Sequence, residues 1–350
     1  MAFGFAIIGC GMIARFHCKA IADIPGAKVV ALIGRTKESA QKLAIEIGLT
    51  DVFCSHSLTE GLAAPGVDAL IVTTPSGVHM DAAIEAAYAG KHVVVEKPLE
   101  ITSARCNAII DACEQAGVLL CTIFPSRFGD ANLELKAAID AGRFGRLTLG
   151  ETTVKWWRDQ RYYDEGGWKG TKALDGGGAL MNQAIHNVDL LLWMMGPVAS
   201  VAAFKDNLAH ERIEVEDTAV AAIHFKNGAM GVIQATTSVW PGLSKTISIH
   251  GNKGSVTIEQ DDLSLWKFQE ELPIDASIRH RFAVKTGASG GSSNPGAISH
   301  VGHTRQLADF MDAIQKGRKP FVDGAQGRRS VELIEAIYRS AESGTVVQLG

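Results

Sequence analysis

The 350-residue sequence predicts an α/β protein of two domains, the first built on a doubly wound parallel sheet. In the first third, short β-branched runs alternate with helical patterns, which is typical of a parallel sheet covered by helices on both faces. Composition also changes along the chain, because all six cysteines precede Thr122 and all six tryptophans occur from Trp156 onward. We therefore expect a first domain over residues 1–124 and a second over residues 125–350.

The apolar runs and helical patterns of the first domain occur in a regular order. Strands are expected over residues 5–8, 29–33, 69–72, 92–95 and 118–121, with helices over 12–24 and 37–47 between the first of them. Right-handed crossovers then give a doubly wound sheet, and because its strands are parallel, their carboxyl ends lie at one edge. Ligands of doubly wound sheets bind beyond that edge, so residues that directly follow a strand are the first candidates for a site.

A glycine-rich turn, Gly9-x-Gly11-x-x-Ala14, follows the first strand and opens the first helix. Gly9 allows the tight turn, Gly11 lets a pyrophosphate approach the backbone, and Ala14 permits close packing of helix on strand. Small residues also serve ordinary turns, but the strand–turn–helix context favours a dinucleotide site. The contacts expected here are Gly9, Gly11, Met12 and Ile13, with the helix N-terminus facing the phosphates.

The end of the second strand reads Ile33-Gly34-Arg35-Thr36, without the acidic residue that binds the ribose hydroxyls of NAD. A guanidinium and a hydroxyl at this place suit the 2′-phosphate of NADP. Alternatively, Arg35 stacks on the adenine, which would accept NAD as well. The sequence therefore favours NADP, with NAD as the alternative.

Three further segments of the first half follow strands and are candidates for the same edge. Thr73–His79 follows the strand at 69–72, Glu96-Lys97-Pro98 follows the strand at 92–95, and Arg127 comes after the strand at 118–121. A lysine held between a glutamate and a proline after a buried strand is not typical of a solubility residue, and its peptide bond to Pro98 is either cis or trans. The contacts predicted with cofactor or substrate are Thr74, Pro75, His79, Glu96, Lys97 and Arg127.

The segment from Gly176 to Asp189 opens with three glycines and continues as a two-faced helix. Leu180, Ala184, Val188, Leu191 and Met195 fall on one apolar stripe. Asn182, His186 and Asp189 fall together on the other side, which predicts one wall of a polar cleft or, alternatively, a solvated helix face.

The segment from Trp156 to Trp168, called here the aromatic segment, precedes this helix and supplies further candidates for substrate binding. Aromatic rings pack against sugar C–H surfaces, and Arg158 is suited to bind a carboxylate or phosphate. The pair Trp156-Trp157 is equally consistent with core packing. The predicted substrate-binding residues are Arg158, Tyr163, Trp168, Asn182 and His186.

The rest of the second domain alternates strand patterns with turn signals. Strands are expected over residues 147–157, 198–205, 218–225, 230–238, 246–250 and 255–259, and Asn227-Gly228 predicts a tight hairpin. Residues 287–296 form a glycine- and serine-rich loop, a candidate lid or a loop tip. His300 and His303 have helical spacing, but without a nearby carboxylate pattern we expect no metal site and assign His303 to a pocket or cap.

Charge, hydropathy and cysteine pattern exclude several classes of function. A net charge of −4 without any basic run argues against a nucleic-acid partner, and no apolar run is long enough for a membrane span. The first strand pattern begins at residue 3, which leaves no room for a signal peptide. The cysteines form no C-x-x-C pair, as expected for reduced thiols. We expect a cytoplasmic protein.

Together, the glycine-rich turn, Thr74-Pro75 with His79, Glu96-Lys97-Pro98, and Gly176-Gly-Gly with His186-x-x-Asp189 resemble the glucose–fructose oxidoreductase, inositol dehydrogenase and rhizopine-catabolism family (Gfo/Idh/MocA). The resemblance spans almost the whole chain. It implies an N-terminal Rossmann domain, a C-terminal α/β domain with a large, mostly antiparallel sheet, and oxidation of a sugar or cyclitol ring hydroxyl, or the reverse reduction. Residues 162–183 most resemble UDP-N-acetyl-2-amino-2-deoxyglucuronate dehydrogenases and close relatives.

The resemblance also implies roles for three residues. His186 would accept the hydroxyl proton, Lys97 would polarise the oxygen, and Asn182 would orient the substrate. Many family members carry aspartate where this chain has Asn182, and an amide cannot act as a carboxylate base. The family architecture also hosts NAD-dependent glycosidases, and a non-catalytic dinucleotide-sensing regulator is a second alternative. A homodimer or homotetramer through the C-terminal sheet is expected.

Overall fold

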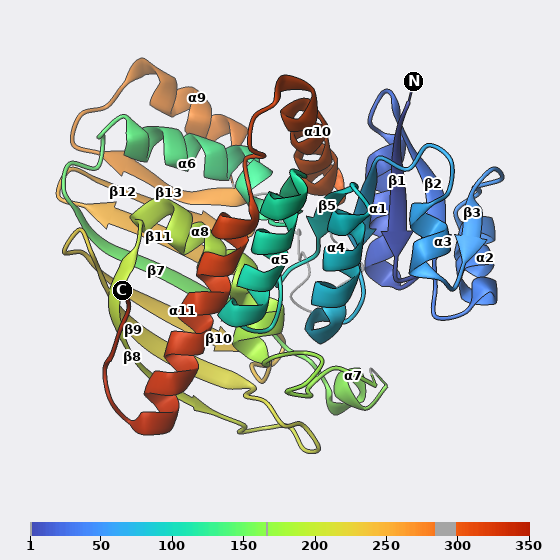
Figure 1. The fold of residues 1–350 in the computed structure, drawn as a ribbon. Helices are drawn as coiled ribbons and strands as arrows, with labels where there is room; N and C mark the ends of the chain where they lie inside the picture. Colours follow the sequence, from blue (N-terminus) through green and yellow to red (C-terminus); the bar gives the residue numbers. More distant parts are fainter. Residues whose placement is uncertain (1, 166, 284–298) are drawn as a thin grey trace. The chain divides into compact units, whose positions relative to one another are not determined.

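The computed structural model describes residues 2–165, 167–283 and 299–350 (Figure 1). It contains two compact units, one of residues 1–125 with 299–331 and one of residues 126–298 with 332–350. The boundary between them along the chain is one residue from the position expected at Phe124. The segment 299–331, which the sequence analysis assigned to the second domain, packs with the first unit. The candidate lid over residues 287–296 lies outside the described residues.

The first unit is built on a six-stranded parallel sheet, as the sequence predicted. The order β3-β2-β1-β4-β5-β6 reverses between β1 and β4, which places the ligand crevice of such a fold beyond the carboxyl ends of these two strands. The strands are β1 (Phe3–Ile8), β2 (Ala27–Ile33), β3 (Phe53–Ser55), β4 (Ala69–Val72), β5 (His92–Val95) and β6 (Leu120–Thr122). The helices are α1 (Met12–Ala22), α2 (Lys37–Glu46), α3 (Leu58–Leu62), α4 (His79–Tyr88), α5 (Ser103–Ala116) and α10 (Val301–Lys316).

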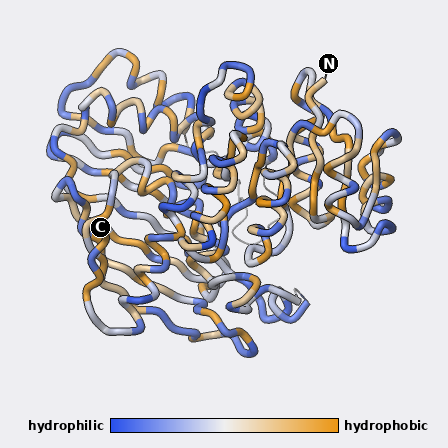
Figure 2. The backbone as a smooth tube through the Cα atoms, in the orientation of Figure 1, coloured by the Kyte–Doolittle hydropathy of each residue, from blue (hydrophilic) through white to orange (hydrophobic). Residues whose placement is uncertain are grey.

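The core of the first unit explains why the β-branched runs form its central strands. Phe5, Ile71 and Val94 are completely buried, and hydrophobic residues mark these strands in Figure 2. Helix α10 completes the core with Phe310. On the same helix, the Gln306 amide donates to the Thr122 carbonyl at 2.7 Å and accepts the Phe124 amide at 3.0 Å, so this late segment of the chain is hydrogen-bonded to the end of β6.

The second unit contains an eight-stranded sheet in the order β13-β12-β11-β7-β10-β9-β8-β14. Among its described strands only β7 and β10 pair in parallel, which confirms a large, mostly antiparallel sheet. The strands are β7 (Leu147–Lys155), β8 (Val198–Asp206), β9 (Thr218–Phe225), β10 (Met230–Thr236), β11 (Thr246–Gly251), β12 (Gly254–Glu259), β13 (Asp262–Phe268) and β14 (Val347–Gln348). Its helices are α6 (Asp130–Asp140), α7 (Gln160–Asp164), a π-helix (Ala179–Ala184), α8 (Ile185–Met195) and α9 (Pro273–Arg281), and α11 (Gly324–Ser343) begins in the first unit and ends in the second.

The two faces of this sheet differ in chemistry. Helix α8 packs on one face against β7 and β11 (Figure 1), so closely that a Cβ at Gly150 would lie 2.6 Å from the Met195 Cγ. The strand register places a set of exposed apolar side chains together on the other face, with Phe204 opposite Val220 and Met230 opposite Leu149. In the described parts of the chain, no helix combines the length and apolar character that a bilayer crossing needs.

Candidate active site

The turn between β1 and α1 has the geometry that its glycines predict. Gly9 has a φ of +98°, and a Cβ there would lie 2.7 Å from the Thr73 carbonyl oxygen, so a side chain is excluded. Nothing lies within 4 Å of a Cβ at Gly11, and both Gly11 and Met12 are exposed. The first amide groups of α1 are therefore accessible to an anion such as a pyrophosphate.

Thr73 fixes this turn, a role the sequence analysis did not identify. Its hydroxyl donates at 2.8 Å to the carbonyls of both Ile8 and Gly9. The end of β4 is thereby tied to the glycine-rich turn at the point where the strand order reverses.

The loop after β2 leaves Arg35 exposed beside the N-terminus of α2. A Cβ at Gly34 would lie 2.2 Å from the Ser39 Oγ and 2.8 Å from the Thr36 carbonyl oxygen, so this position has no room for an acidic side chain. The Thr36 hydroxyl, expected to face a 2′-phosphate, accepts the Ser39 amide at 3.2 Å and caps the helix. Arg35 is thus the cation that this loop presents.

His79 connects the two loops that follow β4 and β5. Its ring is 1% exposed, with Nδ1 3.0 Å from the Pro98 carbonyl and Nε2 2.9 Å from the Thr74 carbonyl. Burial lowers the pKa of His79, against the hydrogen bonds and nearby carboxylates that raise it. The peptide bond between Lys97 and Pro98 is cis. His79 therefore braces the turn that carries Lys97, and its direct contact with a cofactor stays a prediction.

In the second unit, the three glycines lead into a π-helix that helical periodicity did not indicate. A Cβ at Gly177 would lie 2.1 Å from the Tyr338 hydroxyl, and one at Gly178 would lie 1.8 Å from the Glu216 carbonyl oxygen. The buried Glu216 carboxylate accepts the amides of Gly178 at 3.0 Å and Leu180 at 2.9 Å, and the Tyr338 hydroxyl at 2.9 Å. Burial raises the pKa of Glu216, against these hydrogen bonds that lower it. Glu216 thus caps the π-helix, a feature that often marks functional sites.

The expected polar stripe is present in part. Asn182 in the π-helix and His186 in the first turn of α8 are both partly exposed. Asp189 is fully buried, so its expected place on a cleft wall is wrong. The reason is that nine of the eleven residues of α8 are buried, which leaves no polar face at that position.

Asp189 pairs instead with Arg127. The guanidinium donates from Nε at 2.7 Å and from a terminal nitrogen at 2.6 Å to the two carboxylate oxygens, and only 2% of Arg127 is exposed. Such a bidentate pair neutralises both charges inside the second unit. The contact of Arg127 with nicotinamide or substrate stays a prediction.

A chain of polar side chains surrounds Asn182. Its amide donates to the buried Asp175 carboxylate, and its oxygen accepts Nε2 of Gln183 at 2.9 Å. The Gln183 amide also donates to the Tyr162 hydroxyl at 3.0 Å and accepts from Arg158 at 3.1 Å. Asp175, which the sequence analysis missed, thus supplies a carboxylate next to Asn182.

In the aromatic segment, Arg158 and Tyr163 are both buried, and only 4% of Arg158 is exposed. Tyr163 is 7% exposed, and its hydroxyl lies 2.9 Å from the Thr237 hydroxyl, so the ring packs in the core. The Arg158 guanidinium lies 5.1 Å from the Trp156 ring centre and 5.5 Å from that of Tyr162. Lys169 lies 3.7 Å from the Tyr162 ring centre, and burial lowers its pKa. Trp168 is partly exposed, and its contact with substrate, like that of Tyr163, stays a prediction.

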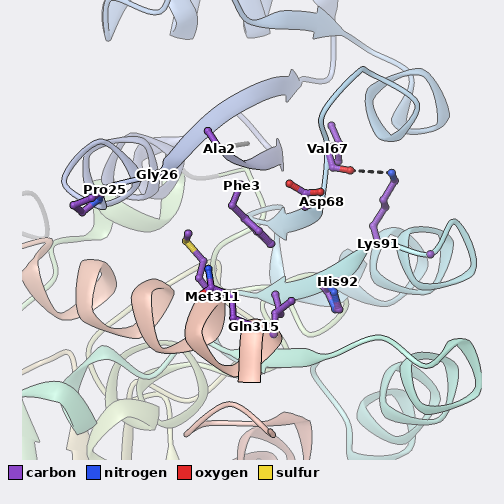
Figure 3. A pocket seen from close by; sticks show the side chains of 12 residues that line it. Ala2, Phe3, Pro25, Gly26, Val67, Asp68, Lys91, His92, Met311 and Gln315 are labelled. Carbon is purple, nitrogen blue, oxygen red and sulfur yellow. Dashed lines mark hydrogen bonds between the residues drawn. The ribbon is translucent and has the colours of Figure 1, made fainter. Parts of the chain in front are cut away.

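A cavity of about 560 Å³ in the first unit lies at the amino ends of the parallel strands, at the edge of the sheet opposite to the glycine-rich turn (Figure 3). Phe3, Asp68 and His92, at or beside the amino ends of β1, β4 and β5, line it together with Met311 of α10. Because ligands of doubly wound sheets bind beyond the carboxyl ends, this cavity is separate from the glycine-rich turn.

Comparison with known proteins assigns both halves of the chain to one family. An oxidoreductase family model described by its NAD-binding Rossmann fold matches residues 3–124, and the GFO/IDH/MocA C-terminal domain matches residues 132–257. The chain belongs to the Gfo/Idh/MocA family. It is therefore an NAD(P)-dependent oxidoreductase of the dehydrogenase and reductase class.

Three relatives of this Gfo/Idh/MocA enzyme span nearly its whole length. The WlbA dehydrogenase of Bordetella pertussis, solved with NADH and UDP-GlcNAcA, is 36% identical with a TM-score of 0.88 and covers 100% of this chain and 99% of its own. WlbA of Chromobacterium violaceum, solved with the same ligands, is 34% identical with a TM-score of 0.87 and covers 100% and 96%. The scyllo-inositol 2-dehydrogenase of Bacillus subtilis is 27% identical over 98% of this chain and 95% of its own.

Proposed function

We propose that this enzyme transfers a hydride between a ring carbon of a sugar, nucleotide sugar or cyclitol and the nicotinamide of NADP, with NAD as the alternative cofactor. The observation that carries the proposal is the accessible backbone turn between β1 and α1. This turn is the pyrophosphate-binding element of the dinucleotide fold, and it occurs in a chain that matches sugar and cyclitol dehydrogenases over its full length.

The chemistry requires a base that removes the hydroxyl proton as the hydride leaves the neighbouring carbon. We assign the proton to His186, and we assign Lys97 to the same oxygen as the cation that stabilises its developing charge. Asn182 orients the substrate, since its amide is itself fixed by Asp175 and Gln183.

The substrate class that the second unit favours is an anionic sugar, for which a UDP-linked amino-sugar uronate is the first candidate. The cations of Arg158 and Lys169 both lie against the ring of Tyr162. A uronate carboxylate or a phosphate suits a guanidinium near aromatic faces, and the sugar ring suits the aromatic surfaces themselves.

The first experiment follows nicotinamide absorbance with UDP-linked amino-sugar uronates, free aldoses and cyclitols, each with NADP and with NAD. Turnover with one of these classes supports the proposal and names the substrate. Free sugar released from a glycoside without reduced cofactor would instead identify the NAD-dependent glycosidase. Dinucleotide binding without turnover of any substrate would favour the regulator.

Replacing Arg35 with alanine is expected to raise the KM for NADP about tenfold or more while changing the KM for NAD less than about twofold. The reason is that a hydrogen bond to a charged group contributes about 1.5–3 kcal/mol, and only NADP carries the 2′-phosphate. Initial rates with each dinucleotide at saturating substrate check this, with Lys37→Ala as the control for an exposed cation nearby, at the first residue of α2. Equal changes with both dinucleotides would show that Arg35 stacks on adenine and would remove the case for NADP.

We also propose a homo-oligomer through the exposed face of the large sheet. The apolar side chains gathered there are Leu149, Phe204, Val220, Met230 and Leu265, and Phe204 is 84% exposed. An apolar patch of this kind is typical of a protein interface.

The oligomer proposal predicts that Phe204→Glu weakens self-association about tenfold or more, because a charge in an apolar interface must be desolvated. Light scattering after size exclusion at several protein concentrations measures this. Ile45→Glu, at a residue 80% exposed on α2, is the control and should leave the mass unchanged. A wild-type chain that is monomeric at every concentration would refute the interface.

A further inference from the structure

A buried cluster of two histidines and a glutamate joins three segments of the first unit. His17 comes from α1, Glu96 directly follows β5, and His303 lies in the first turn of α10. Nε2 of His17 donates to the Glu96 carboxylate at 2.8 Å, and Nε2 of His303 lies 3.6 Å from the same oxygen. All three side chains are at most 7% exposed, so the carboxylate is held away from water.

The second oxygen of this carboxylate is directed at the backbone of Lys97, whose amide donates to it at 3.1 Å. Burial alone would raise the pKa of Glu96, but the hydrogen bonds from His17 and His303 hold it well below its ordinary value, so Glu96 is ionised at neutral pH. The two oxygens thus have different partners, the histidines on one side and the lysine amide on the other. The turn is braced again one residue later, where His79 contacts the Pro98 carbonyl.

The same three side chains have ligand atoms within 4.8 Å of one another, which is compatible with a metal ion. Their surroundings argue against one. Histidines that bind metals almost always donate their other ring nitrogen to an acceptor. Nδ1 of His17 and Nδ1 of His303 are buried and have no hydrogen-bond partner among the described residues.

We propose that Glu96 is a positioning residue for Lys97, whose backbone it fixes through a carboxylate held by His17 and His303. This inference rests on the proposed function, since it takes Lys97 to act in hydride transfer. The side chain of Lys97 is attached to the Cα next to the fixed amide. A shift of that amide therefore changes the position of the ammonium group. Loss of the carboxylate therefore lowers kcat through Lys97 without a direct contact between Glu96 and substrate.

The test is a double-mutant cycle of Glu96→Gln and Lys97→Ala in the full-length enzyme. In Glu96→Gln, the side-chain amide meets N–H donors on both sides but has only one acceptor oxygen, so we expect kcat to fall about 10- to 30-fold with the dinucleotide Kd within about twofold. In the Lys97→Ala background the same change should have almost no further effect, because residues that act together are not additive.

Glu100→Gln is the matched control. Glu100 is also fully buried, follows the same turn, and accepts the amide of the next residue, Ile101, at 2.5 Å, but its other partner is Arg105. We expect kcat to change less than about threefold in this variant. A loss equal to that of Glu96→Gln would make the effect a general one of buried carboxylates and overturn the proposal.

If Glu96→Gln does not fold, the kcat values of two His17 variants test the same role. His17→Phe removes a donor at similar size and should lower kcat about three- to tenfold, and His17→Gln should recover part of that loss. Additive effects in the cycle, or equal losses in His17→Phe and His17→Gln, would overturn the positioning role. One equivalent of zinc in the purified enzyme, removable by a chelator with loss of activity, would overturn it in favour of a metal site. A Lys97→Ala enzyme with normal kcat would instead refute the proposed function.

Discussion

Replacing Lys97 with alanine is expected to lower kcat by about 10²- to 10⁴-fold while dinucleotide affinity changes less than about threefold. The lysine follows β5 at the edge of the sheet where the glycine-rich turn lies, and its turn is fixed by His79 and Glu96. Removing the ammonium group leaves the developing negative charge on the substrate oxygen without its cation, which affects the transition state more than the ground state.

The measurement is the rate of hydride transfer in a single turnover at saturating substrate, together with dinucleotide binding by fluorescence. Lys91→Ala is a close control, because Lys91 precedes the same strand at its amino end and its ammonium group donates to the Val67 carbonyl at 2.9 Å (Figure 3). We expect less than a twofold change in that variant. A Lys97→Ala enzyme that keeps the wild-type rate would exclude the lysine from the chemistry.

The fold was predictable where the determining signal is local. Continuous apolar runs such as residues 69–72 and 92–95 mark buried parallel strands, and both are strands with those bounds. Strand β13 was missed because the hairpin before it lacks a glycine signal, and Gln260 there adopts a φ of +55°. The return of α10 to the first unit was missed because it depends on contacts such as Gln306 with Thr122, which are 184 residues apart.

In the candidate site, too, features with a local sequence signal were predicted, and features that depend on contacts between distant residues were not. The glycine-rich turn was predicted because its sequence motif is local, and Gly9 has the positive φ that this turn requires. The roles of Glu216 and Asp189 in the second unit were not predicted, because each carboxylate acts on a distant segment. Glu216 caps the π-helix that begins 37 residues earlier at Ala179, and Asp189 neutralises Arg127 across 62 residues. Periodicity can suggest a polar face, but it cannot show which of its members are buried against a partner.

The π-helix determines how His186 is held at the start of α8. A wider helical turn directly before α8 places the histidine in the first turn of a helix that is otherwise almost completely buried, and His186 remains partly exposed. Its rigid support comes from the glycines and Glu216 at the start of the π-helix. A base that is held on a buried helix, and is still accessible, is well suited to remove a proton from a bound hydroxyl.

We therefore expect His186→Ala to lower kcat by about 10²- to 10⁴-fold, with circular dichroism and melting temperature close to wild type. Added imidazole should restore part of the rate, because a small base can occupy the space of the missing ring, whereas it should not restore a Lys97→Ala enzyme. His280→Ala, at an exposed histidine on α9, serves as the control and should keep full activity. Turnover of His186→Ala at the wild-type rate would assign the proton to another group, and the Asp175 carboxylate, which holds Asn182 in the same unit, would be the next base to test.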